Sequence, residues 1–379
     1  MKRVAIFPSA FHPALGGVEE LTGQLALHLK KSGVTAMICV NQWPRGLPAF
    51  EKWRGFLVRR FPFRLPEESL KAKLSFYLSH NHILRGLINM LREFKAEIIH
   101  IQCVSSNAWY ACCAASVLKI PLVVSIQGER TMDAQGIYYR SPLYNRVLRR
   151  VLYCADRVTA CSSATLHDVE AFLGRPLGER GEVVYNGVGG EAFEEGAKWP
   201  HPNPYLLALG RLVPQKGFEA LLRAYASAEL SGTDLLIAGD GPQKGTLKVL
   251  MKDLKISGRV HFLGKAGRQM VHALMRGAKG LVVPSLREPM GIVALEGMAA
   301  GIPLLVSSVD GLREIAPENQ WCRHVKPGDV EGLDRGLRWL DGLDAALPLE
   351  PLRVRAQEFL WDRIAREYIT IYSQVSRGG

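Results

Sequence analysis

The sequence lacks several features that mark membrane, disulfide-bonded or zinc proteins. It has no run of about 18 uncharged apolar residues, so we expect no membrane-spanning helix. Its seven cysteines form no Cys-x-x-Cys pair, and most lie in apolar runs, which indicates reduced core thiols without a zinc site or disulfide framework. The N-terminal MKRVAIFP has a basic pair and a short apolar run, which predicts a first buried strand instead of a signal peptide. We therefore expect a cytoplasmic protein.

The length and the hydrophobic pattern predict two α/β domains. The chain has 379 residues, 47% of them hydrophobic and 22% charged, which is enough for two globular domains. Short apolar runs alternate with longer helical patterns, as in doubly wound parallel sheets with helices on both faces. The candidate strands of the first half are 4–7, 34–40, 97–102, 121–126, 157–161 and 182–185, and those of the second half are the runs YLLALG, DLLIAG, RVHFLG, GLVVPS and IPLLVSS.

These patterns set the expected domain boundaries. We place the two Rossmann-like domains at 1–190 and 204–357, and we interpret the Gly-, Pro- and charge-rich stretch 188–204 as a linker. Ligands of open α/β sheets bind at the carboxyl ends of the strands, so we expect a central cleft faced by both domains. The tail 358–379 begins as an amphipathic helix.

Positive charge is concentrated in the first half of the sequence. Residues 1–203 hold 25 Lys and Arg against 17 Asp and Glu, which gives +8 of the net charge of +12. Between 43 and 76, basic residues (Arg45, Lys52, Arg54, Arg59, Arg60, Arg64, Lys71, Lys73) are interleaved with aromatic ones (Trp43, Phe50, Trp53, Phe56, Phe61, Phe63, Phe76). This mixture suits an anionic membrane surface or an anionic acceptor, and a solvated basic face with the aromatics turned inward is the alternative. No nucleic-acid-binding motif accompanies the charge, so we expect no nucleic acid partner.

The segment REPMGIVALEGMAAG, residues 287–301, places two glutamates around a helix start. Glu288 precedes a proline, which disfavours helical angles, and Gly291 permits a turn before a helical run. Glu296 then lies inside that helix among apolar side chains, where a carboxylate needs a partner, and the nearby sequence offers no cation. The free N–H groups of the helix start suit phosphate. A nucleotide sugar, with hydroxyls at both ends and phosphates between, fits this pattern, and solvent-exposed glutamates on an ordinary helix are the alternative.

Other glycines and cations follow predicted strands. Gly16 and Gly17 precede a helix, so that backbone can approach a ligand there, with phosphate expected at the helix start. Their spacing differs from the G-x-G-x-x-G of nicotinamide and flavin enzymes. A plain turn is the alternative. Arg211 and Lys216 follow the first strand of the second half and are candidates for binding a diphosphate leaving group. The run HFLGK, residues 261–265, is a candidate for presenting backbone to a nucleobase.

Taken together, GGVEE, YNGV, LGRLVPQKG, AGDGP and EPMGIVALEGMAAGIPLL, in this order, resemble the family-4 retaining glycosyltransferases of the GT-B fold over essentially the whole chain. The resemblance implies that Glu296 holds ribose hydroxyls and that Glu288 faces the transferred sugar. It implies backbone contacts near the phosphates from Gly291, Ile292 and Val293.

The same resemblance assigns the remaining candidate residues. Arg211 and Lys216 match a diphosphate clamp, and the C-terminal helix is expected to cross back onto the first domain. The other donor-binding candidates are Gly16, Gly17, Gln127, Leu263 and Gly264.

Two positions depart from the family pattern. Where the family commonly has a histidine after the strand at 121–126, this chain has Gln127, which cannot titrate but can hydrogen-bond a sugar hydroxyl. In SVDGLREI, Asp310 stands where a second glycine is usual, which leaves the conformation of that loop open.

We therefore expect a retaining hexosyltransferase that uses a UDP- or GDP-linked sugar and a hydroxyl acceptor, such as a lipid-linked saccharide, in envelope polysaccharide, lipopolysaccharide or glycolipid assembly. We expect it to act in the cytoplasm, or at the inner face of the cell membrane as a peripheral protein. No cofactor or metal is expected, because cationic side chains and a helix start supply positive charge. The alternatives are a nucleotide-sugar epimerase or phosphorylase of the same architecture, and a non-catalytic membrane-associated binding protein.

Overall fold

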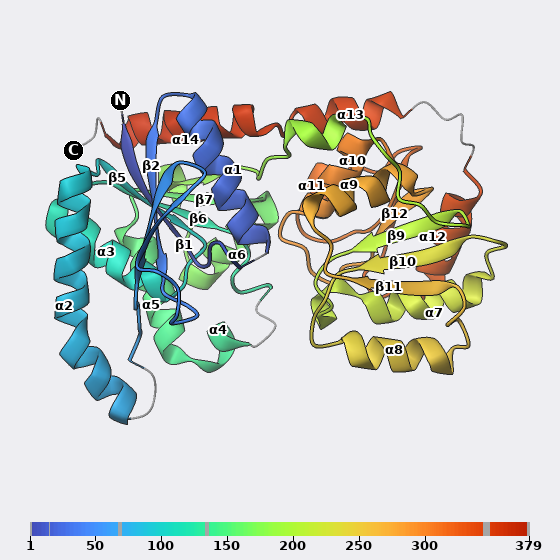
Figure 1. Cartoon of the computed structure of the whole chain (residues 1–379), viewed down its shortest axis with the longest axis horizontal. Helices are drawn as coiled ribbons and strands as arrows, with labels where there is room; N and C mark the ends of the chain where they lie inside the picture. Colours follow the sequence, from blue (N-terminus) through green and yellow to red (C-terminus); the bar gives the residue numbers. More distant parts are fainter. Residues whose placement is uncertain (1, 15, 67–69, 133–135, 344–348, 377–379) are drawn as a thin grey trace. The chain divides into compact units, whose positions relative to one another are not determined.

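The computed structural model describes residues 2–14, 16–66, 70–132, 136–343 and 349–376, and the chain divides into two compact α/β units. The first unit comprises 1–185 together with 361–379, and the second comprises 186–360. Figure 1 shows that each unit is built on a sheet flanked by helices. Both sheets consist mainly of parallel strands, which confirms the predicted fold of two doubly wound parallel-sheet domains.

The sheet of the first unit has the strand order β3-β4-β2-β1-β5-β6-β7-β8. Neighbouring strands are parallel except in the hairpin β3-β4. The central strands are buried along almost their whole length because helices cover both faces, which explains their near-continuous apolar sequences. The strands are β1 (Arg3–Pro8), β2 (Thr35–Asn41), β3 (Phe50–Trp53), β4 (Phe56–Phe61), β5 (Ile98–Gln102), β6 (Leu122–Ile126), β7 (Arg157–Ala160) and β8 (Gly181–Val183).

Different helices cover the two faces of this sheet. The helices of the described residues are α1 (Gly17–Lys31), α2 (Leu70–Phe94), α3 (Ser106–Leu118), α4 (Ile137–Arg140), α5 (Pro142–Cys154), α6 (Ser163–Leu173) and α14 (Trp361–Val375). Alternate strand residues point to opposite faces. One set, which includes Phe7 and Ile101, forms a core with α2, α3 and α5. On the other face α14, although it ends the described chain, packs beside α1.

A buried polar network joins α14 to the sheet. The Nδ1 atom of His100 lies 2.7 Å from the hydroxyl of Tyr372, and its Nε2 atom lies 2.7 Å from Oγ of Ser125. Ser125 also contacts the hydroxyl of Tyr368 at 3.0 Å. Burial lowers the pKa of His100 to about 3, so the ring is neutral and needs one donor and one acceptor as partners, which the hydroxyls supply.

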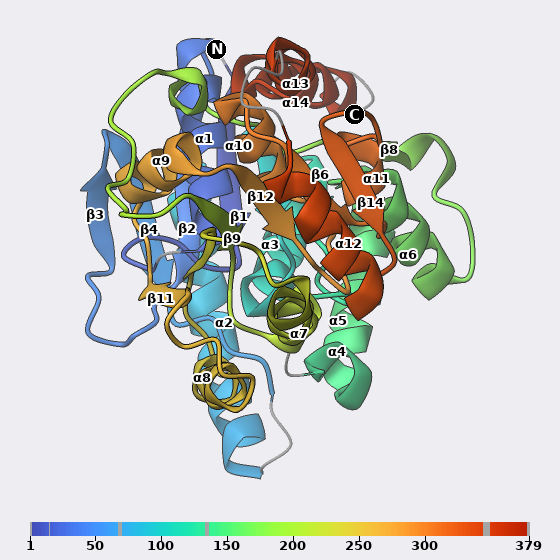
Figure 2. The same cartoon turned by 90° about the vertical axis from the view of Figure 1, so that its right-hand side faces the viewer.

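The sheet of the second unit has the order β11-β10-β9-β12-β13-β14, and all neighbouring strands are parallel. Its strands are β9 (Tyr205–Leu209), β10 (Asp234–Ala238), β11 (Val260–Gly264), β12 (Gly280–Val283), β13 (Leu304–Ser307) and β14 (Cys322–Val325). Its helices are α7 (Phe218–Ala228), α8 (Lys244–Asp253), α9 (Arg268–Gly277), α10 (Ile292–Ala300), α11 (Leu312–Ile315), α12 (Val330–Asp341) and α13 (Glu350–Gln357). Helices α7 and α12 pack together on one face of the sheet, and α9 and α10 lie on the other (Figure 2).

The structure adds three strands to those that the sequence predicts. The hairpin β3-β4 turns at Arg54 and Gly55, which both have positive φ as in the tight turns that suit two-residue hairpins. Strand β14 has a polar centre and extends the second sheet at its edge. The stretch 188–204, interpreted from composition as a linker, is partly structured: Gly190–Phe193 forms a 3-10 turn within the second unit.

None of the described helices is both long and apolar enough to cross a bilayer.

Candidate functional site

Loops at the carboxyl ends of β9 and β12 bring Lys216 and Glu288 together in the second unit. The Nζ atom of Lys216 donates to Oε2 of Glu288 at 2.5 Å, and Oγ of Ser285 donates to the same oxygen at 2.9 Å. Glu288 is only 8% exposed. The N–H of Leu286 donates to the carbonyl of Gln215 at 2.7 Å, which ties the two loops together. The site therefore holds a nearly buried ion pair that the two predicted residues form with each other.

Asp310 supports the loop that carries Glu288. Its φ angle of 37° lies in the left-handed region that a glycine adopts without strain, and Asp is among the residues that tolerate it. Its carboxylate accepts the backbone N–H of Glu288 at 2.9 Å and Nη1 of Arg287 at 3.2 Å. The carbonyl of Glu288 in turn accepts the N–H of Gly311 at 3.1 Å. The departure from the family pattern thus keeps the glycine-like backbone and adds a side-chain anchor.

The predicted helix after Gly291 is present as α10, and Ile292 and Val293 at its start are partly exposed. Gly291 has a φ angle of 98°, and a Cβ atom there would lie 2.4 Å from Cδ2 of Leu312, so glycine is required both by conformation and by space. The N–H groups of Ile292 and Val293 belong to the first turn, where no preceding helical carbonyl can accept them. With the positive end of the helix dipole, N–H groups in such a position are suited to binding an anion, and they lie close to Glu288 in the chain.

Glu296 is partly buried on α10, and its electrostatic partners come from distant segments. Burial raises the pKa of Glu296 to about 7, although the positive charge of Arg268 acts to lower it, and Glu191 raises it further. Arg268, at the start of α9, also forms an ion pair with Glu191 of the 3-10 turn Gly190–Phe193. The local sequence shows no cation for Glu296, but the fold supplies Arg268. The only sequence signal for this arginine is that it begins the helix that follows β11.

The other second-unit candidates lie around this position with fewer contacts. Arg211 is exposed after β9, and no hydrogen bond or ion pair of its side chain is found within the described ranges. Leu263 and Gly264 end β11 and are partly exposed. The carbonyl of Gly264 accepts the N–H of Gly239 at 2.7 Å, so the ends of β10 and β11 are fixed relative to each other. All predicted residues of the second half therefore lie at or after the carboxyl ends of its strands or in α10.

In the first unit, Gly16 and Gly17 are exposed at the start of α1. A Cβ atom on Gly17 would meet nothing within 4 Å, which leaves open space at the helix start. The first turn also carries Glu19 and Glu20, and the carboxylate of Glu19 lies over Gly16. These negative charges already complement the helix dipole and act against the phosphate that the sequence leads us to expect at this helix start.

Gln127 follows β6 in the first unit, and a buried carboxylate fixes its backbone. Glu129 accepts the N–H of Gln127 at 2.9 Å and the N–H of Val104 at 2.7 Å. Burial raises the pKa of Glu129 in spite of these hydrogen bonds, which act in the opposite direction. Glu129 is not predicted from the sequence, because a lone glutamate in a loop carries no signal of burial.

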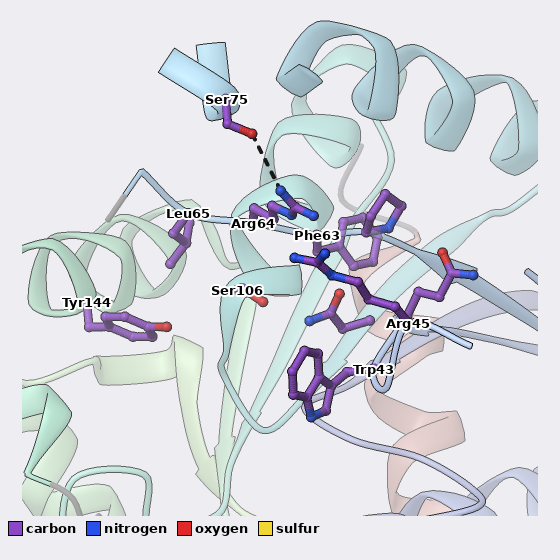
Figure 3. A pocket seen from close by; sticks show the side chains of 11 residues that line it. Trp43, Arg45, Phe63, Arg64, Leu65, Ser75, Ser106 and Tyr144 are labelled. Atoms are coloured by element: carbon purple, nitrogen blue, oxygen red, sulfur yellow. Dashed lines mark hydrogen bonds between the residues drawn. The ribbon is translucent and has the colours of Figure 1, made fainter. Parts of the chain in front are cut away.

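A cavity of about 540 Å³ opens in the first unit at the carboxyl ends of β2 and β4. Figure 3 shows Arg45, Arg64, Trp43 and Tyr144 around it. Nη1 of Arg64 lies 3.4 Å from Oγ of Ser75, which belongs to α2. The cavity therefore combines two cations with aromatic and amide groups.

The structure divides the aromatic residues of 43–76 between the interior and the surface. Phe56, Phe63 and Phe76 are buried, whereas Trp43 and Phe50 are exposed. The three buried rings are turned inward, as the alternative of a solvated basic face predicted, and the interpretation as a membrane or acceptor surface stays a prediction.

One His/Asp cluster that the sequence spacing does not reveal occurs among the described residues. His201, Asp234 and His261 place one ligand atom each within 4.8 Å of one another. Oδ2 of Asp234 accepts from Nε2 of His201 at 2.8 Å and from Nδ2 of Asn203 at 3.2 Å, and Nε2 of His261 lies 3.3 Å away. Asp234 begins β10, at the opposite end of the strand from the Glu288 loop, and nearby Arg259 supplies positive charge. The cluster is thus a satisfied hydrogen-bond network remote from the candidate site.

Two family models match the chain in succession. The model described as Glycosyltransferase Family 4 matches residues 15–189, and the model described as Glycosyl transferases group 1 matches residues 191–342. A glycogen synthase of Mycobacterium tuberculosis is 30% identical over 301 residues, covering 76% of this chain and 71% of its own length. An uncharacterized glycosyltransferase of Methanocaldococcus jannaschii is 28% identical over 329 residues, covering 78% and 82%.

Solved structures show the same fold at low sequence identity. A sucrose-phosphate synthase of Thermosynechococcus elongatus has a TM-score of 0.78 at 20% identity, with complete coverage of both chains. The Anabaena protein HepE, solved in complex with UDP and glucose, has a TM-score of 0.77 at 17% identity, covering 99% of this chain and 100% of its own.

Proposed function

Because the chain belongs to the family-4, group 1 glycosyltransferases, we propose that it moves a hexose from a nucleoside diphosphate sugar to an acceptor hydroxyl with retention of configuration. The observation that carries this proposal is the Lys216–Glu288 pair beside the N-terminus of α10, which has no side-chain cap, with Glu296 within the same helix. This arrangement offers a cation, an anion-binding helix start and carboxylates to one elongated polyol diphosphate. UDP is the first nucleotide to test, since HepE was solved with it.

The diphosphate of the donor is proposed to bind between α10 and the β9 loop. The N–H groups of Ile292 and Val293 would donate to one phosphate, and Lys216 and Arg211 would bind the other. An ammonium group has three donors, so Lys216 can keep its contact with Glu288 and still bind a phosphate oxygen.

The two glutamates are proposed to hold the ends of the donor. The Glu296 carboxylate would accept the ribose hydroxyls, and Arg268 orients it by charge. Glu288 would accept hydroxyls of the transferred sugar, while Leu263 and Gly264 border the base. In the first unit, Gly16, Gly17 and Gln127 are proposed to contact sugar hydroxyls.

The proposed reaction breaks the bond between the anomeric carbon and the β-phosphate oxygen and forms a bond to the acceptor oxygen on the same face. The departing phosphate takes the acceptor's proton. Negative charge grows on that phosphate as the bond breaks, so Lys216, Arg211 and the start of α10 stabilise the transition state more than the bound donor. We propose that no metal is needed, because these groups supply the positive charge, and that the acceptor belongs to envelope polysaccharide, lipopolysaccharide or glycolipid assembly.

A panel of nucleotide sugars tests this proposal by thermal shift and by transfer assays. A donor that binds the folded protein raises its melting temperature according to its concentration relative to Kd. We expect a UDP- or GDP-linked hexose to give the largest shift and to transfer with retention, as read by NMR of the product anomer. Turnover that requires inorganic phosphate, or a changed sugar without any acceptor, would replace the proposal by a phosphorylase or an epimerase.

A further inference from the structure

The first turns of α2 present an apolar face to solvent. Leu70, Leu74, Tyr77 and Leu78 are 86%, 62%, 71% and 75% exposed. Their spacing of four, seven and eight residues places them on one side of a helix. Four large apolar side chains grouped in this way are more than the scattered exposed residues of an ordinary surface.

The opposite side of the same helix is anchored in the protein. Phe76, Ile83 and Leu87 are buried in the core of the first unit. The exposed face is therefore held in a fixed orientation by the packing of the buried one. Figure 1 shows the N-terminal end of α2 extending beyond the other labelled elements of that unit.

Basic residues border this face, and acidic residues are absent from it. At about 100° per residue, Lys71 and Lys73 fall on opposite sides of the apolar stripe, and Arg85 continues the stripe. The sequence of α2 has no acidic residue before Glu93. An apolar stripe flanked by lysines, whose stems lie along apolar surface while their ammonium groups reach outward, is typical of helices that lie in the headgroup region of a bilayer.

The cavity of Figure 3 adjoins this face. Ser75 of α2 lines it, and its hydroxyl contacts the guanidinium of Arg64. Arg45 and Arg64 offer donors that match a phosphate group, and Trp43, 72% exposed, is an aromatic residue of the kind that favours the membrane interface. An apolar face and two cations thus belong to adjoining parts of the first unit, and a phospholipid has acyl chains and a phosphate to match them.

We propose that the exposed face of α2 docks on a bilayer containing anionic phospholipids, and that the adjoining cavity binds the phosphate of a lipid headgroup through Arg45 and Arg64. The binding needs neither donor nor acceptor, so it stands or falls separately from the proposed reaction. Its consequence is that a membrane-bound acceptor would be met by a protein already at the lipid surface.

Vesicle co-sedimentation of the full chain tests this proposal in the absence of nucleotide sugar. We expect binding to phosphatidylcholine vesicles that contain phosphatidylglycerol, at least about tenfold stronger than to phosphatidylcholine alone and weakened by salt. Replacing both Leu74 and Leu78 by glutamate should reduce binding to the anionic vesicles by at least about tenfold. The matched control replaces Val117 and Val249, two exposed valines of α3 and α8, by glutamate and should bind like wild type.

The cavity is tested by replacing Arg45 and Arg64 with glutamine. This variant should retain the weak binding to phosphatidylcholine and lose most of the preference for phosphatidylglycerol. All substituted side chains are exposed, and circular dichroism checks that each variant is folded. Equal binding by wild type and the double-glutamate α2 variant, or no binding by folded wild type, would overturn the proposal. Full release by excess glycerol phosphate would also overturn it, because the phosphate contact alone would then account for the binding and the apolar face of α2 would contribute nothing.

Discussion

At the scale of single residues, the site depends on how burial and charge act on a few carboxylates. Glu288 and Glu296 lie eight positions apart and differ in their surroundings. Lys216 pairs directly with the first, whereas burial dominates the second and raises its pKa to about 7. Glu288 thus already has a cationic partner. Glu296 is more fully ionised when the hydroxyl groups of a ligand donate to it, because they add to the positive charge of Arg268 in offsetting the cost of burial.

The Lys216–Glu288 pair gives the first prediction. Changing Lys216 to alanine should lower kcat by about 100-fold, because one of the charges opposite the leaving phosphate is lost. It should also lower the melting temperature, since Glu288 remains buried without its cation. Changing Glu288 to glutamine keeps the shape of the side chain and should lower kcat/KM with a smaller effect on melting. Lys248→Ala, an exposed lysine of α8, is the control. Normal kcat in both site variants would remove these residues from the proposed chemistry.

The raised pKa of Glu296 gives a prediction about pH. Ribose hydroxyls donate to the ionised carboxylate, so the Kd of a nucleotide sugar should fall as the pH rises from about 6 to about 8 through the pKa of Glu296. In Glu296→Gln the affinity should be weaker and this pH dependence should disappear. Isothermal titration calorimetry with an intact nucleotide sugar is suitable, because its diphosphate bridge does not titrate in this range. The same pH dependence in the glutamine variant would mean that another group titrates.

At the scale of elements, local signals predicted the helix and loop of the site, and tertiary contacts completed it. Proline after Glu288 and glycine at 291 defined the start of α10 from sequence alone. Arg268 could not be assigned to Glu296, because the two meet only when α9 and α10 pack on the same face of the second sheet. The hairpin β3-β4 was missed because its turn uses Arg54 with positive φ, a conformation that the residue type does not signal.

Asp310 allows a direct test of how the loop that carries Glu288 is held in place. Asp310→Gly keeps the left-handed backbone but removes the acceptor for the N–H of Glu288, so the loop should lose its orientation. Losing such a hydrogen bond costs about 1–3 kcal/mol, which corresponds to a drop of about 5- to 150-fold in kcat/KM. Asp310→Asn retains an acceptor and should recover much of the activity. A fully active glycine variant would show that this anchor is dispensable.

The helix α14 provides an element-scale test of stability. The pKa of His100 is lowered to about 3 in the folded state and has its usual value of about 6.5 in the unfolded state. The unfolded state therefore binds the proton more readily, so the stability that depends on the neutral ring is complete above about pH 6.5 and falls as the pH drops toward 3. Each pH unit in that window costs about 1.4 kcal/mol. When the pH is lowered from about 7 to about 5, the melting temperature of His100→Asn should therefore fall less than that of wild type. The exposed His82→Asn is the control, and an unchanged pH dependence in His100→Asn would contradict the role of the buried ring.

At the scale of the whole molecule, the candidate residues divide between the two units. Residues 1–185 with 361–379 hold Gly16, Gly17 and Gln127, and residues 186–360 hold the cations, the two glutamates and the start of α10. The first helix start carries its own carboxylates, whereas the start of α10 has none in its first turn. Phosphate binding should therefore belong to the second unit and hydroxyl contacts to the first.

Hydrogen–deuterium exchange with UDP and with UDP-glucose tests this division in the intact protein. UDP should slow exchange in peptides that contain residues 211–217 and 286–296, because bound phosphate accepts N–H groups of the α10 start and stabilises both loops. UDP-glucose should add protection near 16–20 and 127–129, since only the sugar offers hydroxyls to the first unit. Peptides of α8 should exchange alike in all states. Protection by UDP that is confined to the first unit would place the diphosphate at α1, where Glu19 and Glu20 oppose it, and would reverse the assignment of the two units.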